Sequence, residues 1–507
     1  MVTRRFQALT LGFAAALFAI LLSAQASAAP DAHVWNVRTF GATGDGHHLD
    51  TAAVNSAIAA CAAGGGGIVE VGPGNYRVGT IRLLSDVTLK LDAGSRLLAS
   101  ADLADYVPIS RSSEERSTSL IVAEGAENVG IVGDGVIDGN GRAFVVEPRQ
   151  PHPAGFYDAT STRQGARFFA RNQENRDGPD RMKDRPGILA LFLECRNVTV
   201  RGITIVDAPN WCLHLACCRS ATLDHLTIRN SLRIPNSDAI DLGACRDVRV
   251  ADCVLEAGDD GIAISPCSDG FAAGVAENIT VSRCTIVSRS AGIRLGWAAR
   301  DIRHVSFDHL VIRDSNRGIG LFVRGQESIE DVTFEDITIE SHLVDGAWWG
   351  LGEPIHISVA PYNARTASGH VRGVRFRRVT ATSESPVVLY ASARGQIRDI
   401  ALEQCRLELK TSPLDADYGG NLDLRPVTPA AQGIVKRDLA ALVAVNVDDL
   451  KLDELDIRWL GQPSPFFKSA LALDACAHPI LKNIRSIPSA LPTLIEDGQI
   501  HPDSTGH

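Results

Sequence analysis

A short pattern of alternating apolar and polar residues recurs along most of the chain. Clear copies begin at Val198, Ala221 and Val248, which are 23 and then 27 residues apart. Period-two alternation is typical of a β-strand with one buried face. The hairpins of a sandwich would not repeat one motif at this interval, whereas a solenoid coil with about three short strands has this length. The pattern therefore predicts an all-β fold, a single-stranded right-handed parallel β-helix whose equivalent positions stack into ladders.

The N-terminal part of the repeat region has a different pattern. Residues 50–60 are helical in composition, with Asp50 as a plausible N-cap, and the glycines at 64–67 end the pattern. A solenoid leaves an open strand edge at its end, which needs cover. We therefore expect a short N-terminal capping helix within a cap of about residues 37–72.

Residues 142–185 interrupt the repeat, and we expect a long loop insertion there. Between residues 163 and 185 this segment has seven basic and four acidic side chains. Such a stretch is most often a solvated surface loop. The alternative is a basic wall beside a cleft that takes an anionic substrate.

The first 28 residues have the features of a signal peptide. Arg4 and Arg5 precede an apolar run over residues 8–24, and small residues at 26–28 provide a cleavage site. A membrane anchor is the alternative, because the run is almost long enough to span a bilayer. We expect export to the periplasm or medium, with residues 29–507 as one β-helix domain, monomeric and free of the membrane after cleavage.

Composition and cysteines exclude other classes. The chain has 50 Lys and Arg against 60 Asp and Glu, so its net charge of -10 disfavours nucleic-acid binding. Of eleven cysteines, Cys195, Cys218 and Cys245 each precede or begin a strand-like segment. No CxxC pair is present, so a zinc site is not expected. We expect these thiols to be small buried side chains at repeated positions.

The sharpest chemical signal is a pair of acidic motifs. Residues 236–241 read Asn-Ser-Asp-Ala-Ile-Asp, and residues 258–264 read Gly-Asp-Asp-Gly-Ile-Ala-Ile. Asp238 and Asp259 are 21 residues apart, close to one coil, so the motifs should lie on adjacent rungs about 4.8 Å apart. Crowded carboxylates raise one another's pKa, and a protonated acid beside an ionised one is what glycosidic cleavage needs. Calcium ligation and simple turn formation are the alternatives.

At these motifs the chain resembles glycoside hydrolase family 28, the polygalacturonase family of pectin hydrolases. Further sequence segments that match the family lie at residues 40–46, 132–139 and 207–214, so the resemblance extends from about residue 37 to 339. The resemblance implies a β-helix and inverting hydrolysis of α-linked galacturonan-type polymers without a cofactor or metal. It also implies that Asp259 is the general acid, while Asp238 and Asp260 hold and activate the water.

The chain departs from the family pattern in two places. Ser290 stands where the family has a histidine, and Gly320-Leu321-Phe322 stands where it has Arg-Ile-Lys. We hypothesise that three nearby arginines supply shifted contacts to the anionic substrate, because a guanidinium can bind a carboxylate bidentately. A surface salt bridge is the alternative for each one. These arginines are Arg294, Arg317 and Arg324.

Other residues are expected to contact substrate. The predicted substrate-binding set contains Asn236, Asp241, Ser290, Arg294, Arg317, Arg324 and His356. His356 alternates with isoleucines and should point outward. Trp348 and Trp349 could stack on a sugar ring, although core packing is the commoner role of an aromatic. The sequence thus predicts an exported glycoside hydrolase of a pectic, anionic polysaccharide, with a substituted or rhamnose-containing chain favoured by the departures. A calcium-dependent lyase and a non-catalytic carbohydrate-binding β-helix remain alternatives.

Overall fold

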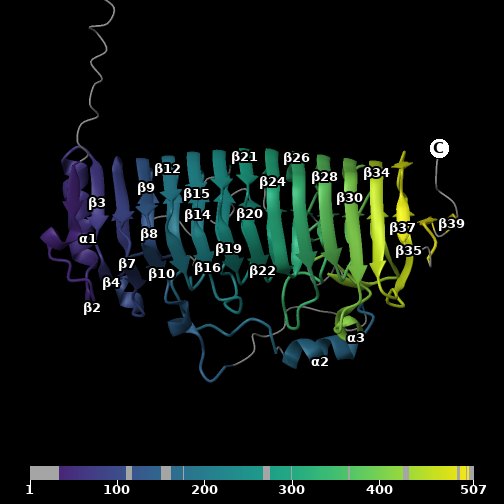
Figure 1. Ribbon diagram of the computed structural model, residues 1–507, viewed down its shortest axis with the longest axis horizontal. Coiled ribbons are helices and arrows are strands. Elements are labelled where there is room, and N and C mark those ends of the chain that lie inside the picture. Colours follow the sequence, from purple (N-terminus) through teal and green to yellow (C-terminus); the bar gives the residue numbers. More distant parts are fainter. Residues whose placement is uncertain are drawn as a thin grey trace, which may run out of the picture.

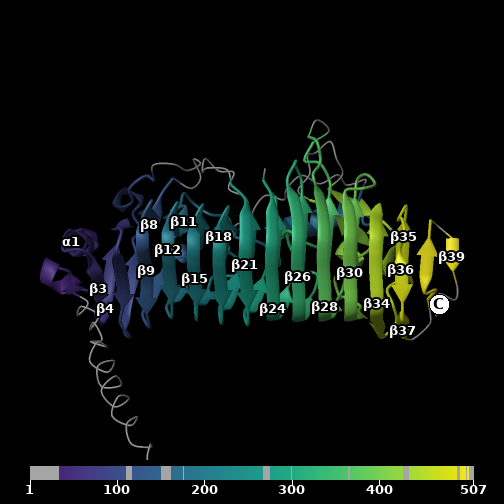
Figure 2. The same ribbon diagram turned by 90° about the horizontal axis from the view of Figure 1, so that it is seen from above.

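The chain winds into a solenoid of parallel strands. The computed structural model describes residues 33–109, 117–149, 161–174, 176–265, 274–297, 300–363, 366–425, 433–487, 491–497 and 499–501. Figures 1 and 2 show the coils stacked along one long axis, with α1 at one end and β39 at the other. Parallel strands joined by crossovers wind right-handedly. The predicted right-handed parallel β-helix is confirmed.

From β3 onward, each early coil contributes one strand to each of three stacks, whereas the first coil contributes to two. The first stack contains β1 (Val34–Asn36), β3 (Gly67–Val71), β6 (Val87–Leu91), β9 (Glu127–Gly133), β12 (Arg196–Arg201), β15 (Arg219–Asp224), β18 (Arg246–Ala251) and β21 (Ala276–Ser282). The second contains β2 (Asp45–Leu49), β4 (Gly74–Val78), β7 (Ser95–Ala99), β10 (Val136–Asp138), β13 (Thr204–Val206), β16 (Thr227–Arg229), β19 (Val254–Ala257) and β22 (Thr285–Ser288).

The first two stacks later merge, because single strands of 14 residues span both. These are β24 (Ile302–Ser315), β26 (Ser328–Ser341), β28 (His370–Ser383), β30 (Ile397–Lys410) and β34 (Val447–Leu460), followed by the short β36 (Ile480–Lys482) and β37 (Arg485–Ile487). Each long strand keeps at least two bent residues with positive φ, such as His304 and His309 in β24. The three-strand coil predicted from the repeat is therefore found in the early coils. In the later coils one long strand replaces the first two short strands.

The third stack is a separate fourteen-stranded sheet, which we call the third sheet. It contains β5 (Ile81–Leu83), β8 (Ser119–Glu124), β11 (Ile188–Leu193), β14 (Leu213–Ala216), β17 (Ile240–Gly243), β20 (Ile262–Ser265), β23 (Ala291–Gly296), β25 (Arg317–Val323), β27 (Ile355–Val359), β29 (Val387–Ala391), β33 (Leu439–Val445), β35 (Phe467–Asp474), β38 (Leu494–Glu496) and β39 (Gln499–His501). A separate antiparallel pair is formed by β31 (Asn421–Asp423) and β32 (Ile434–Lys436).

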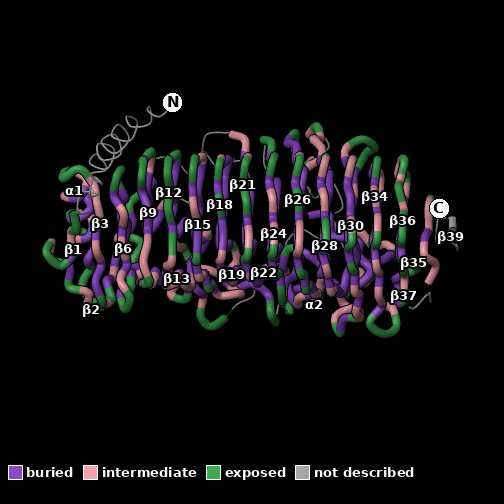
Figure 3. The backbone as a smooth tube through the Cα atoms, turned by 45° about the horizontal axis from the view of Figure 1, so that its top comes forward, coloured by how far each residue is buried: buried purple, intermediate pink, exposed green. Residues whose placement is uncertain are grey.

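The register follows the repeat that the sequence predicts. Val198 pairs with Ala221, and Ala221 pairs with Val248. Polar side chains stack between coils in the same way, since the Asn197 amide donates to Asn128 Oδ1 at 3.0 Å. Buried positions follow the inward-facing side chains of the strands, while many turns are exposed (Figure 3).

The cysteines occupy the buried ladder positions that were predicted. Cys195 and Cys218 are 1% and 0% exposed, and Cys218 Sγ lies 3.2 Å from the carbonyl oxygen of Phe192. Both are free thiols, as is Cys245. Their role is packing inside the coils.

The expected helix is present at the N-terminal end. Helix α1 (Thr51–Ala63) buries Val54 and Ile58 against the first coils. Asp50 occupies the N-cap position, but its carboxylate accepts hydrogen bonds from the N–H groups of Thr43 and Gly44 instead of capping the helix. Short 3-10 turns lie at η1 (Val37–Phe40), η2 (Leu103–Asp105) and η4 (Gly141–Phe144).

The insertion at 142–185 reaches coils far along the chain. Its helix α2 (Ala166–Glu174) lies beside α3 (Asp415–Tyr418) below the coils (Figure 1), and the rings of Phe168 and Tyr418 are 5.4 Å apart. Arg171 binds Asp345 at 3.0 and 2.6 Å. A second helix arginine, Arg167, lies 2.7 Å from Asp417 and pairs with it. These two cations are balanced by acids of α3 and of the segment between β26 and β27, so they form a docking contact.

The segment that we considered as a possible membrane anchor is the apolar run at residues 8–24. Within the described ranges, no helix combines the length and apolar character needed to cross a bilayer. The predicted signal peptide, residues 1–28, lies outside the described residues.

Candidate active site

The acidic motifs come together where two neighbouring strands of the third sheet begin. Asp238 precedes β17, and Asp259 and Asp260 precede β20. Ile240 pairs with Ile262, so the coil here is 22 residues long. The Asp238 backbone therefore lies opposite Asp260, one position away from the partner that the 21-residue spacing suggested. The pairing places the two motifs on adjacent rungs, as predicted, and fixes a register that the spacing left open.

The three aspartates form one tight, buried group. Asp238, Asp259 and Asp260 are 3%, 8% and 3% exposed. One carboxylate oxygen of each lies within 4.8 Å of the others. Burial and mutual repulsion both disfavour the charged forms at this spacing.

The pKa values of two aspartates are raised. Burial, reinforced by the charge of Asp260, raises the pKa of Asp259 to about 7. Burial also holds the pKa of Asp238 well above its ordinary value, with the charges of Asp241, Asp259 and Asp260 adding to the effect. Asp259 can therefore hold a proton close to neutral pH, as a general acid must.

Arg294 balances the charge of the third aspartate. Its Nε donates to Asp260 Oδ2, and the Ala291 N–H donates to Asp260 Oδ1 at 3.1 Å. Burial disfavours the cation, but the nearby negative charges of Asp260 and Asp238 outweigh it and raise the pKa of Arg294. Asp260 is thus the member of the cluster that is paired with a cation.

Two polar neighbours hold Asp259 in place. The Asn236 N–H donates to Asp259 Oδ2 at 3.3 Å, and the nearby Ser290 hydroxyl opposes the rise in the pKa of Asp259. Asn236 adopts a left-handed conformation with φ of 58°, which turns the chain just before Asp238. Ser290 therefore contacts the cluster from the position where the family resemblance expects a histidine.

A column of side chains crosses the third sheet beside the cluster. In register order it contains His214, Asp241, Ala263, Arg294, Gly320 and His356. Asp241 is 1% exposed and contributes to the raised pKa of Asp238. Asp241 and Arg294 lie in the cluster region, whereas His356 is two rungs beyond Arg294.

The structure places Arg317 and Arg324 in internal contacts. Arg317 is 2% exposed and lies 3.2 Å from Glu353 and 3.3 Å from Asp423. Arg324 is equally buried, and its guanidinium donates to backbone oxygens of Ser358 and Leu424 at 2.9 and 3.0 Å. Both arginines anchor residues 421–425 across β25. Of the three predicted arginines, Arg294 is the one in contact with the aspartates.

His356 lies on the predicted face but is covered. It is 0% exposed, with Nδ1 3.4 Å from Glu353 and its ring 5.3 Å from that of Phe322. Burial lowers its pKa against the opposing effect of Glu353. A covered imidazole with a lowered pKa is neutral at neutral pH, so its place here is in the packing against Phe322 and Glu353.

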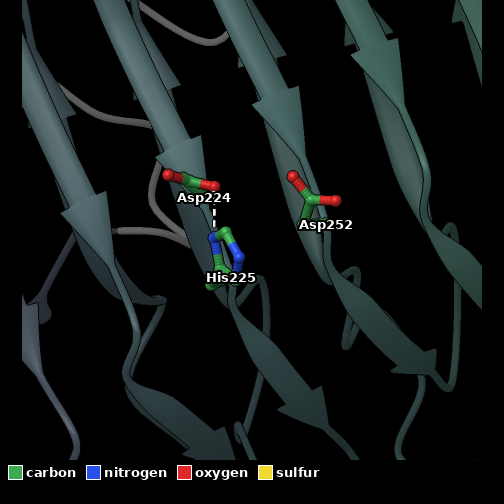
Figure 4. A group of neighbouring side chains, drawn as sticks. All are labelled: Asp224, His225 and Asp252. Carbon is green, nitrogen blue, oxygen red and sulfur yellow. Dashed lines mark hydrogen bonds and ion pairs between the residues drawn. The ribbon is translucent and has the colours of Figure 1, made fainter.

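Among the residues that the structure describes, two groups of side chains have the spacing of metal ligands. In the aspartate cluster, Arg294 already occupies one oxygen of Asp260, and a cation in that place opposes a calcium ion, which needs six to eight oxygens. The second group, Asp224, His225 and Asp252, lies on neighbouring strands at the other side of the coil (Figure 4). Its acids pair with Arg201 and Arg283, so their charge is balanced.

The sequence reasoning missed several residues around the site. Asp423 and Arg425 pair with each other at 2.7 Å and lie over β25. Trp297 directly follows the strand that holds Arg294 and is 40% exposed. An aromatic directly after a glycine at the end of a strand is a weak signal, and only contacts between distant segments bring Trp297 and Arg425 together around Trp349.

Comparison with known proteins decides the family. A family model described as Glycosyl hydrolases family 28 matches residues 61–414. The chain belongs to this family. It is therefore a glycoside hydrolase, and the three aspartates lie within the matched region.

Individual relatives of this family 28 chain are distant. It is 26% identical over 375 residues to a probable polygalacturonase of Vitis vinifera, covering 70% of each chain. It is 27% identical over 269 residues to an exo-poly-alpha-D-galacturonosidase of Dickeya chrysanthemi, covering 48% of this chain and 43% of that one. The family 28 exopolygalacturonase of Yersinia enterocolitica has the same fold, with a TM-score of 0.63 and 17% identity over 88% of this chain and 78% of the other.

Proposed function

We propose that this family 28 protein is exported and hydrolyses α-glycosidic bonds of pectic polysaccharides, of the galacturonan or rhamnogalacturonan type, by an inverting acid/base mechanism. The relatives named above as polygalacturonases support a pectic substrate. The observation that carries the proposal is the buried Asp238, Asp259 and Asp260 cluster, in which Asp259 has a pKa of about 7.

The roles divide according to the contacts. Asp259 protonates the leaving glycosidic oxygen, since burial keeps it protonated near neutral pH. Asp260, whose charge Arg294 balances, accepts the proton of the attacking water. Asp238 lies opposite Asp260 on the adjacent rung and holds that water by hydrogen bonding. Arg294, Ser290, Asn236 and Asp241 position these groups, and Arg317, Arg324 and His356 support the surrounding wall.

A reducing-end assay on a panel of pectic polysaccharides tests the proposal. We expect release of reducing ends by the wild type and a loss of at least about a hundred-fold with Asp238→Asn or Asp259→Asn. Asp252→Asn, in the other acidic group, is the matched control and should keep wild-type activity. Equal release by the wild type and both cluster variants would remove these aspartates from the mechanism.

Three further measurements separate the alternatives. Products that absorb in the ultraviolet, together with activity lost on chelation, would instead identify a calcium-dependent lyase. Nuclear magnetic resonance of the first product gives its anomeric form; a retained anomer would mean that an aspartate attacks the sugar, as the close carboxylate spacing would also permit. The N-terminus of the mature protein tests export, for which we expect cleavage after Ala28.

A further inference from the structure

Two tryptophans next to the candidate active site expose a large part of their surface. Trp297 directly follows β23 and is 40% exposed, and Trp349 lies between β26 and β27 and is 37% exposed. Their ring centroids are 5.7 Å apart, and the ring planes meet at 74°. Adjacent exposed aromatic rings leave apolar area in water, which a ligand can cover.

Surrounding contacts hold this pair in position. The Trp297 N–H donates to the Phe322 oxygen at 2.9 Å, and the Asn316 side chain donates to the Trp349 oxygen at 3.0 Å. The guanidinium carbon of Arg425 lies 5.1 Å from the centre of the Trp349 ring. Because Arg425 is itself fixed by a bidentate pair with Asp423, the ring rests on a rigid support.

The pair is also close to the reacting groups. Trp297 follows Arg294 by three residues, so their Cα atoms are at most about 11 Å apart. Arg294 contacts Asp260 directly. A polymer that threads past the aspartates therefore comes within reach of the two rings.

The exposed area limits what can bind there. A stable protein partner buries about 800 Å² on each side, far more than two partly covered side chains offer. Two rings at a steep angle form a corner with two apolar walls, which fits one flat, rigid ring. The C–H face of a pyranose has that shape and polarity.

We propose that Trp297 and Trp349 form a subsite that packs against one sugar ring of the polysaccharide bound at the aspartate cluster. This inference rests on the proposed function, because the occupant is a further sugar of the same polymer. The subsite contributes binding by stacking and takes no part in proton transfer.

The test measures binding and turnover separately. Binding of galacturonan and rhamnogalacturonan oligosaccharides of increasing length is followed by calorimetry in the Asp259→Asn background. Turnover is measured with native Asp259. We expect Trp297→Ala and Trp349→Ala each to weaken binding of the longer oligosaccharides roughly ten-fold and to raise KM with little change in kcat. The shortest oligosaccharide that binds should be unaffected.

Matched variants distinguish stacking on a planar ring from contact with any bulky apolar side chain. Trp349→Tyr should restore most of the binding, whereas Trp349→Leu, which is apolar but not planar, should not. Leu103→Ala, at a distant position that is 41% exposed, is the control and should behave as the wild type.

The outcomes distinguish the two proposals. A wild type that cleaves and binds these polymers, with tryptophan variants indistinguishable from Leu103→Ala, would overturn the subsite and leave the proposed function intact. Equal binding by the Tyr and Leu variants would overturn stacking. A wild type that neither binds nor cleaves any of the polymers would defeat the proposed function and the subsite with it.

Discussion

Replacing Asp259 with asparagine should abolish activity and stabilise the protein. The pKa of Asp259 rises from its ordinary value of 3.8 to about 7 on folding. The folded state therefore binds this proton more tightly than the unfolded state, so folding stability falls as pH rises between these two values. The difference in pKa corresponds to about 4 kcal/mol, which is reached in full above about pH 7.

Asparagine is neutral at every pH and avoids this cost. For a chain of 507 residues, an unfolding entropy of about 2.1 cal/mol/K per residue converts 4 kcal/mol into a melting-temperature rise of about 4 °C. The hydrogen bond from the Asn236 N–H reduces the gain, because asparagine has one acceptor oxygen where the carboxylate has two. We expect a rise of about 2 to 4 °C at about pH 8 and almost none at about pH 4.

Thermal unfolding of the wild type and of Asp259→Asn at a series of pH values provides the assay. Asp252→Asn is an opposite-sign control, because hydrogen bonding to Arg283 lowers the pKa of Asp252. Its carboxylate stabilises the fold above about pH 4, so its replacement should lower the melting temperature there. A difference between Asp259→Asn and wild type that does not grow with pH would refute the linkage between burial of this acid and its proton.

Three other perturbations follow from the same contacts. The kcat/KM of the wild type should decline above about pH 7 as Asp259 loses its proton, and a profile that keeps rising into the alkaline range would contradict its role as the acid. Arg294→Gln should lower the free energy of unfolding by about 3 kcal/mol and remove most of the activity, because it leaves Asp260 buried without its cation. Arg294→Lys should retain more stability in melting measurements and more activity in rate measurements. Arg171→Ala should release α2 from Asp345 and speed proteolysis within residues 142–185, with the aspartate cluster unchanged; an unaltered cleavage rate would show that other contacts hold the insertion.

The fold was largely predictable, because a solenoid repeats one local rule. Alternation of apolar and polar residues fixes which face of each strand is buried, and pairing between neighbouring coils then fixes the register, as at Val198, Ala221 and Val248. The docking of α2 on α3 was not predictable. It joins residues about 250 positions apart through ion pairs such as that of Arg167 and Asp417, and local patterns carry no information about such contacts.

The site was predictable in part for the same reason. The aspartates lie on adjacent coils, as their spacing indicated, but the position of Asp238 opposite Asp260 depends on strand pairing that the spacing alone left open by one residue. The positions of Arg317 and Arg324 on their strand did not indicate which side chains would surround them. Their guanidinium groups are held by residues 421–425, about a hundred positions later in the chain.

The altered cations bear on which pectic chain fits the site. The family resemblance assigns two cations to the grip on a substrate carboxylate, and their positions are filled here by Gly320 and Phe322. Arg294 lies one rung earlier in the Gly320 column, but its guanidinium binds Asp260 and the Gly296 oxygen. A cation balanced by a neighbouring carboxylate attracts a substrate anion less than a free one. We therefore expect a negative charge on the sugar beside Arg294 to contribute less to binding. Packing against Trp297 and Trp349 should then contribute more to substrate selection.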